Sequence, residues 1–182
     1  MTIQEILNNI GSFSEFDAAL FEKCTTRKVL NKNEVILREG EVCKSMYYIL
    51  SGSFYQYQID DIFETIIDLH LEDEWMFNHQ SLISQMPSNT TIKAFSKAEV
   101  IILSLENFHY MASRAQSFLQ FGKILNPTFQ RTFLFDNALN PAESYDYIQK
   151  AKPQLVKEFP VKMIASYLKI APETLSRVRA KY

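Results

Sequence analysis

The basic side chains of this sequence gather at its C-terminal end. Residues 152–182 hold seven Lys and Arg against two Asp and Glu, a formal charge of +5, while residues 1–151 hold 12 basic and 19 acidic residues, a formal charge of −7. Because phosphate neutralisation dominates nucleic-acid affinity, a basic segment on an acidic body indicates a polyanion partner. Lysines on ordinary solvated helix faces would give the same count, so charge alone leaves both interpretations open.

Residues that bind metals or act as nucleophiles are few and scattered. The cysteines, Cys24 and Cys43, form no CxxC pair, and the histidines, His70, His79 and His109, show no HxH spacing. An iron–sulfur cluster needs about four thiolates, more than one chain supplies, and haem ligation by a histidine is a minor alternative. The sequence also lacks a nucleophile motif and a glycine-rich phosphate loop. We therefore expect no enzyme, no metal site and no cofactor.

The length of 182 residues, 47% of them hydrophobic and 13% aromatic, suits one large domain or two small ones with a buried core. No apolar run is long enough for a membrane span, and the start of the chain, MTIQEILNNI, does not resemble a signal peptide. The two cysteines could pair or stay free, but they form no disulfide framework. We expect a cytoplasmic protein that does not enter a membrane.

The elements that must position the basic segment begin with short helices and strands. Helical spacing in residues 2–24, broken at Gly11, predicts two short helices. Residues 29–105 then favour strands: EVILREG, SMYYILSG, SFYQYQI, FETIIDLHL, TIKAF and EVIILSL. Strands without intervening helices predict an antiparallel barrel or sandwich. The loop at residues 75–91, WMFNHQSLISQMPSNTT, is too long for a hairpin turn, so it is either functional or disordered.

Helical spacing returns after residue 105. LENFHYMASR predicts a short helix, and residues 115–139 predict a longer one that Pro127 kinks or breaks. Residues three and four apart in this longer helix would form either a dimer seam or ordinary packing against the barrel. The seam consists of Phe118, Phe121, Leu125, Thr128, Thr132, Phe135 and Leu139. Pro153 and Pro160 divide the remaining chain into short pieces.

Two motifs are typical of known folds. REGEVCKSMYYILSGSFYQY, at residues 38–57, looks like the early β-roll of cyclic-nucleotide-binding domains, with Gly40 and Gly52 at turns that need positive φ angles. PVKMIASYLKIAPETLSRVRAKY, at residues 160–182, has the apolar spacing of a helix-turn-helix. There Pro172 suits the first position of the second helix, while Ala171 is a poor N-cap. A plain αα-hairpin with a solvated face is the alternative.

Together these motifs resemble the CRP/FNR family of bacterial transcription regulators, and the match in order and spacing covers nearly the whole chain. The resemblance implies an α+β chain with an N-terminal antiparallel β-roll (a double-stranded β-helix jelly roll) and flanking helices as sensor domain in residues 1–114. A long dimerisation helix would follow in residues 115–139, and a small all-α helix-turn-helix domain in residues 140–182. Lys169 replaces the family's turn glycine and Ala171 its threonine cap, and the β wing that follows in many members is minimal or absent.

The resemblance also implies a DNA partner and a homodimer that reads a palindromic operator. Glu173 and Arg177 match positions that read base edges, where a carboxylate accepts from cytosine N4 and a guanidinium donates to guanine O6 and N7. Thr174 and Ser176 match positions suited to the phosphate backbone, and Arg179 or Lys181 would add charge. Pro172 stands where some members have a further base-reading arginine, so the operator should differ from theirs.

The loop at residues 75–91 aligns with the family's phosphate cassette. Phe77 and Asn78 stand at the Gly-Glu positions, and Ser88 stands at the arginine that neutralises the cyclic phosphate, followed by Asn89 and Thr90. Without that cation a phosphate would lose a charge-assisted hydrogen bond of roughly 1.5 to 3 kcal/mol. A cyclic nucleotide effector is possible but disfavoured, and an uncharged effector or none is expected.

The missing cassette residues and the missing wing favour one competing hypothesis. The chain could be a ligand-binding or protein-interaction module, still able to bind a cyclic nucleotide, that has lost DNA binding. A salt-dependent shift of DNA on addition of the protein separates the two hypotheses.

Overall fold

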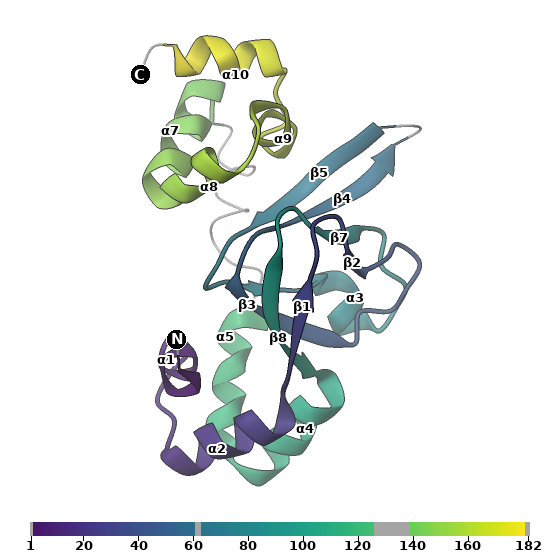
Figure 1. The fold of residues 1–182 in the computed structure, drawn as a ribbon, viewed down its shortest axis with the longest axis vertical. Coiled ribbons are helices and arrows are strands. Elements are labelled where there is room, and N and C mark those ends of the chain that lie inside the picture. Colours follow the sequence, from purple (N-terminus) through teal and green to yellow (C-terminus); the bar gives the residue numbers. More distant parts are fainter. Residues whose placement is uncertain (1, 61–62, 126–138, 181–182) are drawn as a thin grey trace.

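The computed structural model describes residues 2–60, 63–125 and 139–180 (Figure 1). The helices before residue 126 are α1 (Ile3–Asn8), α2 (Glu15–Cys24), α3 (His79–Ser84), α4 (Leu105–Arg114), the 3₁₀ helix η1 (Gln116–Phe121) and α5 (Gly122–Leu125). The C-terminal helices are α7 (Pro141–Ala151), α8 (Pro153–Glu158), α9 (Val161–Tyr167) and α10 (Pro172–Arg179). The strands are β1 (Thr26–Leu30), β2 (Val35–Leu37), β3 (Ser45–Ser51), β4 (Phe54–Asp60), β5 (Phe63–His70), β6 (Trp75–Met76), β7 (Thr91–Ala94) and β8 (Ala98–Ser104).

Strands β1 to β8 form a β-roll of two four-stranded sheets. One sheet has the order β1-β8-β3-β6 and the other the order β2-β7-β4-β5. Every pairing between these strands is antiparallel, and the longest is the β4–β5 hairpin, which runs from Phe54 opposite His70 to Asp60 opposite Phe63. The prediction of antiparallel sheets with flanking helices is therefore confirmed.

The turns and helix ends follow from local residue chemistry. Gly40 and Gly52 have φ angles of 85° and 82°, as their turns require, so the prediction of positive φ at both is confirmed. A Cβ at Gly52 would also lie 2.5 Å from the carbonyl oxygen of Lys97. Thr2 and Ser14 close capping boxes at the starts of α1 and α2, which confirms the two short helices predicted there.

The segment after α4 differs from the long helix that the sequence predicts. Ala115 is extended, with φ −148°, and the chain then forms η1 and α5, while the predicted kink at Pro127 lies outside the described residues. Phe118 and Phe121 are fully buried and contact Phe13, so in the described chain they take part in internal packing, which the sequence left open as the alternative to a dimer seam. The physical reason is the three-residue repeat of a 3₁₀ helix, which places these two rings on one face, toward the protein's own core.

The other residues of the predicted seam do not share one environment. Leu125 is half-buried and packs against the same core as the two rings. Leu139 is half-buried against a second core, which contains α7 to α10. Thr128, Thr132 and Phe135 lie outside the described residues, so their place in a seam stays a prediction.

The C-terminal helices contact the outer face of the β4–β5 hairpin chiefly through α9, which lies beside β5 (Figure 1). Tyr55, Tyr57, Ile66 and Leu69 from the hairpin form one apolar cluster with the buried side chains of the C-terminal helices. The backbone N–H of Ile66 donates to the Ser166 hydroxyl at 2.9 Å. The outer face of this sheet is thus a packing surface within the chain.

The remaining sequence predictions have clear outcomes in the described residues. All six predicted strands are present, but β1 was largely missed, and the two-residue strand β6 lies inside the long loop, where no strand was predicted. Cys24 and Cys43 are both free and buried. Within the described ranges, no helix is long and apolar enough to cross a membrane.

Candidate functional site

The α9–α10 pair is joined by a tight turn at Lys169. Two backbone hydrogen bonds of 3.0 Å close the end of α9. The Ile170 N–H donates to the Ala165 carbonyl, and the Lys169 N–H donates to the Ser166 carbonyl. This pair of bonds is the Schellman motif. Lys169 adopts φ 56°, in the left-handed region that a glycine adopts without strain. The lysine at this position is therefore held in a conformation that costs free energy.

Helix α10 begins with Pro172 in its first turn and has no side-chain cap at Ala171. The predictions of a proline start and a poor N-cap at these positions are both confirmed. Ala165 and Leu175 are fully buried where α9 and α10 meet, and the small alanine lets the two helices approach closely. The two helices therefore pack against each other through buried residues, and one side of α10 stays exposed.

The exposed side of α10 carries the residues that the sequence predicted as a polyanion-binding face. Glu173, Ser176, Arg177 and Arg179 are exposed, and Thr174 is half-buried, whereas Lys181 lies outside the described residues. Glu173 and Arg177 are four residues apart and so lie on one face of the helix. The helix lies at the far end of the molecule from α2 and α4 (Figure 1).

The Arg177 guanidinium folds back along its own helix. Its Nε donates to the Glu173 carbonyl at 3.4 Å, and one terminal nitrogen lies 3.5 Å from the Thr174 hydroxyl. Both distances are at the long limit for a hydrogen bond, so these contacts are weak. An exposed arginine held this loosely can extend toward a ligand at little cost.

The predicted cassette is a closed network of buried polar groups. The Thr90 hydroxyl accepts a hydrogen bond from Gln56 Nε2 at 2.6 Å and another from Asn78 Nδ2 at 2.7 Å. Asn78 also caps α3 by accepting from the Ser81 N–H at 2.8 Å. The Ser88 hydroxyl donates to the Thr90 carbonyl at 2.7 Å. All five side chains are at most 7% exposed, so the polar atoms of the cassette bind one another.

The structure brings three of the five predicted cassette residues together, namely Asn78, Ser88 and Thr90. Phe77 is half-buried against the core, and Asn89 is exposed, so neither joins the network. The sequence analysis missed Gln56 and Ser81. Gln56 had a recognisable signal, because it lies between two tyrosines on a strand whose alternation turns it toward the inside of the roll.

Other titratable groups of the roll are structural. Burial raises the pKa of Tyr48 to about 12, with the nearby Asp73 carboxylate as a further cause. Burial also raises the pKa of the Cys43 thiol, which disfavours the reactive thiolate. His79 bonds the Leu125 carbonyl at 2.6 Å, and this contact ties α3 to α5. Within the residues the structure describes, no group of three or more His, Cys, Asp or Glu could hold a metal ion.

The β-roll matches a known protein family. Residues 27–115 match the family model "Cyclic nucleotide-binding domain". A comparison with curated protein sequences gives no significant match. The β-roll therefore shares both its fold and its sequence pattern with cyclic nucleotide-binding domains.

Solved structures of bacterial regulators share the fold of nearly the whole chain. FixK2 from Bradyrhizobium japonicum is 16% identical with a TM-score of 0.67, and the match covers 86% of this chain and 83% of that one. A CooA variant from Carboxydothermus hydrogenoformans is 16% identical with a TM-score of 0.66, covering 100% and 84%. The catabolite activator protein of Thermus thermophilus is 16% identical with a TM-score of 0.60, covering 97% and 85%. The chain thus has the fold of CRP/FNR-type regulators.

Proposed function

We propose that this protein is a DNA-binding transcription regulator of the CRP/FNR type, acting in the cytoplasm as a homodimer on a palindromic operator. One observation carries the proposal: the exposed face of α10 presents Glu173 and Arg177 one turn apart, on a helix pair joined by a tight turn. In this proposal α9 and α10 form a helix-turn-helix, and α10 is the recognition helix that enters the major groove. The fold of the chain supports this proposal, because DNR from Pseudomonas aeruginosa, a "transcriptional regulator", has a similar fold.

Each exposed residue of α10 has a role in this proposal. Arg177 exchanges its two long intrahelical contacts for a bidentate pair with guanine O6 and N7, and Glu173 accepts from cytosine N4. Ser176, Thr174 and Arg179 contact the phosphate backbone, and Lys181 adds charge. The remaining lysines of residues 152–182 supply the non-specific attraction that makes binding depend on salt.

The cassette supports a sensor that does not hold cyclic AMP in the usual way. Ser88 stands at the arginine position, and its hydroxyl already bonds the Thr90 carbonyl. The amides of Gln56 and Asn78 both donate to the Thr90 hydroxyl, so a phosphate would have to break these bonds and would gain no cation. Titration of the purified protein with cyclic AMP and cyclic GMP should therefore show no binding at micromolar concentration.

The dimer has to use surfaces other than Phe118 and Phe121, which are buried in the monomer. The segment that starts at Leu125 and contains Thr128, Thr132 and Phe135 is the proposed seam. Two recognition helices about one helical turn of DNA apart would then meet the two half-sites of a palindrome.

Selection from random DNA with the full chain tests the proposal. The expected result is a palindromic consensus and a DNase footprint on the protein's own promoter, together with a dimer mass in native mass spectrometry. Binding should weaken steeply as salt rises. A protein that yields neither a consensus nor a footprint is instead a ligand-binding or protein-interaction module that has lost DNA binding.

A further inference from the structure

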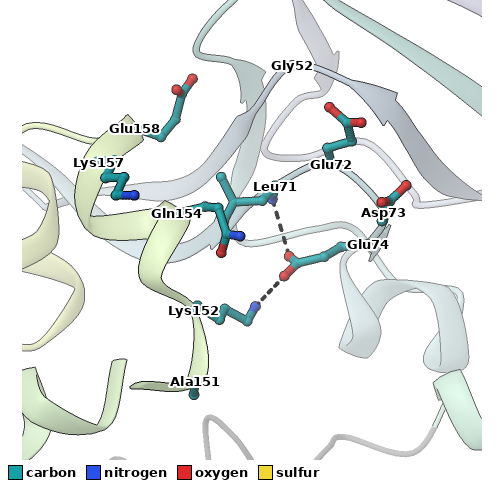
Figure 2. Close-up of a pocket in the computed structure, with 10 residues that line it drawn as sticks. All are labelled: Gly52, Leu71, Glu72, Asp73, Glu74, Ala151, Lys152, Gln154, Lys157 and Glu158. Atoms are coloured by element: carbon teal, nitrogen blue, oxygen red, sulfur yellow. Dashed lines mark hydrogen bonds and ion pairs between the residues drawn. The ribbon is translucent and has the colours of Figure 1, made fainter. Parts of the chain in front are cut away.

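A cleft of about 750 Å³ lies between the β-roll and the C-terminal helices (Figure 2). One wall is α8 with the residues just before it, and the other is the turn of residues 71–74 between β5 and β6, with Gly52 at the rim. This volume is within the range of small-molecule sites, and such sites often lie where two domains meet. The cleft is separate from the cassette and from the exposed face of α10.

An ion pair joins the two walls. Glu74 Oε1 and Lys152 Nζ lie 2.6 Å apart, and the other oxygen of Glu74 accepts from the Leu71 N–H at 3.2 Å (Figure 2). These two charges neutralise each other and fix the distance between the walls.

Two further carboxylates of the cleft are also engaged. Glu158 accepts a hydrogen bond from the Ser53 hydroxyl at 2.6 Å. Asp73 accepts one from the Tyr48 hydroxyl at 3.4 Å. Both donors are neutral hydroxyl groups, so Asp73 and Glu158 keep their negative charges, which add to the attraction of the cleft for an ammonium group.

The lining groups left after these pairings are one carboxylate, one ammonium and one amide. In the part of the chain that the structure describes, the side chains of Glu72, Gln154 and Lys157 make no hydrogen bond or ion pair. Glu72 comes from the turn on one wall, whereas Gln154 and Lys157 come from α8 on the opposite wall (Figure 2). Of the side chains without any partner, Glu72 is an anion and Lys157 is a cation, and they come from opposite walls of the cleft. A molecule that joins both must carry an ammonium group at one end and a carboxylate at the other.

We propose that this cleft binds a small zwitterion of the amino-acid or short-peptide class. The ligand's ammonium group pairs with Glu72, its carboxylate pairs with Lys157, and Gln154 donates or accepts beside the carboxylate. Because the two anchors belong to different domains, an occupied cleft holds the C-terminal helices against the β-roll more firmly than the Glu74–Lys152 pair alone. This site goes beyond the proposed DNA binding and does not depend on it.

Calorimetric titration of the full chain, without DNA, tests the site. The probes are ε-aminohexanoate and triglycine, which carry both end charges, and the controls are hexanoate and hexylamine, which carry one each. We expect the zwitterions to bind at least about tenfold more tightly than either control, and bound ligand to raise the unfolding temperature. Lys157→Met and Glu72→Gln should each weaken binding by about tenfold or more. The exposed, distant changes Lys23→Met and Glu106→Gln remove the same charges and should leave binding unchanged.

Three outcomes would overturn the proposal: no binding of either zwitterion at about 10 mM, hexylamine or hexanoate binding as tightly as the zwitterions, or zwitterion binding that Lys157→Met and Glu72→Gln leave intact. Both variants change exposed side chains, so their folding is verified by circular dichroism before titration. Because no DNA is present, a negative result here leaves the proposed operator binding standing, and a failed footprint leaves this site standing.

Discussion

Glu74 and Lys152 join the β-roll to the C-terminal helices through an ion pair of 2.6 Å between Oε1 and Nζ. The side chains are only 25% and 24% exposed, so the pair is more shielded from water than the pair of Lys150 and Asp146, which has the same 2.6 Å separation but side chains that are 76% and 35% exposed. Shielded charges interact more strongly than exposed ones, and an unpaired charge left behind is more costly. The contrast between these two pairs gives a direct test of how the C-terminal helices are held on the β-roll.

Lys152→Met should destabilise the protein by about 1 to 2 kcal/mol, because it leaves Glu74 half-buried without its partner. The matched change Lys150→Met should cost less than about 0.5 kcal/mol, since an exposed i,i+4 pair contributes little. Chemical unfolding of both variants measures the difference. Equal costs would mean that the Glu74–Lys152 pair is no stronger than a surface pair, and that the apolar cluster alone holds the helices on the hairpin.

Lys169→Gly should stabilise the protein by about 0.5 to 1 kcal/mol, because Lys169 has a φ of 56° and glycine adopts such a conformation without strain. The matched control is Lys162→Gly in the first turn of α9, where glycine should cost about 0.5 to 1 kcal/mol. Urea unfolding of the two variants should give changes of opposite sign. Destabilisation by both would show that the lysine side chain at the turn contributes more than its backbone strain costs.

The β-roll was predictable because its turns and strands are encoded locally. Gly40 and Gly52 mark turns that need positive φ, and alternating apolar residues mark the strands between them. The docking of the C-terminal helices was not predictable in this way. Tyr55 and Tyr57 lie on the outer face of β4, and a strand pattern shows that such a face is apolar but does not show what covers it.

The relative positions of the candidate residues were predictable where spacing on one helix decides them, as for Glu173 and Arg177, and less so where long-range contacts decide them. Asn78 and Thr90 are twelve residues apart, and Gln56 comes from a different strand, so only the folded chain shows that one hydroxyl joins them. The sequence also did not decide whether Phe121 lies at a dimer interface or in the core. The same apolar spacing serves a dimer seam or an internal core, and only the 3₁₀ geometry of η1 separates them.

Thr90→Val should destabilise the protein by about 2 to 3 kcal/mol, because it leaves the buried amides of Gln56 and Asn78 without their common acceptor. The matched control is Thr65→Val on β5, where the hydroxyl makes no hydrogen bond within the described chain and valine suits a strand equally well. That change should alter the free energy of unfolding by less than about 0.5 kcal/mol. A neutral Thr90→Val would argue against a closed cassette and in favour of one that water or a ligand can enter.

The stability of the protein should fall as the pH rises from about 10 to about 12, because burial raises the pKa of Tyr48 to about 12. The sign follows from the folded state, which holds the phenol proton more tightly than the unfolded chain does. The stabilisation is therefore complete below pH 10 and lost as the pH approaches the folded pKa. Unfolding of Tyr48→Phe should show a weaker pH dependence over this range, by up to about 2 kcal/mol. The change Tyr110→Phe, at a tyrosine 46% exposed, is the control and should leave the pH dependence as it is.

Arg177→Ala and Arg179→Ala should affect DNA binding in different ways, although both remove an exposed arginine from the same helix. If Arg177 reads a guanine, its loss should cost about 1 to 3 kcal/mol on the operator and relax the choice of base at one position in each half-site. If Arg179 contacts phosphate, its loss should weaken binding to all sequences alike and lower the salt slope by about one. Binding of each variant to the operator and to single-base variants of it, at several salt concentrations, separates the two effects. The reverse pattern would exchange the roles of the two arginines and turn the reading face of α10 by two residues, away from Glu173.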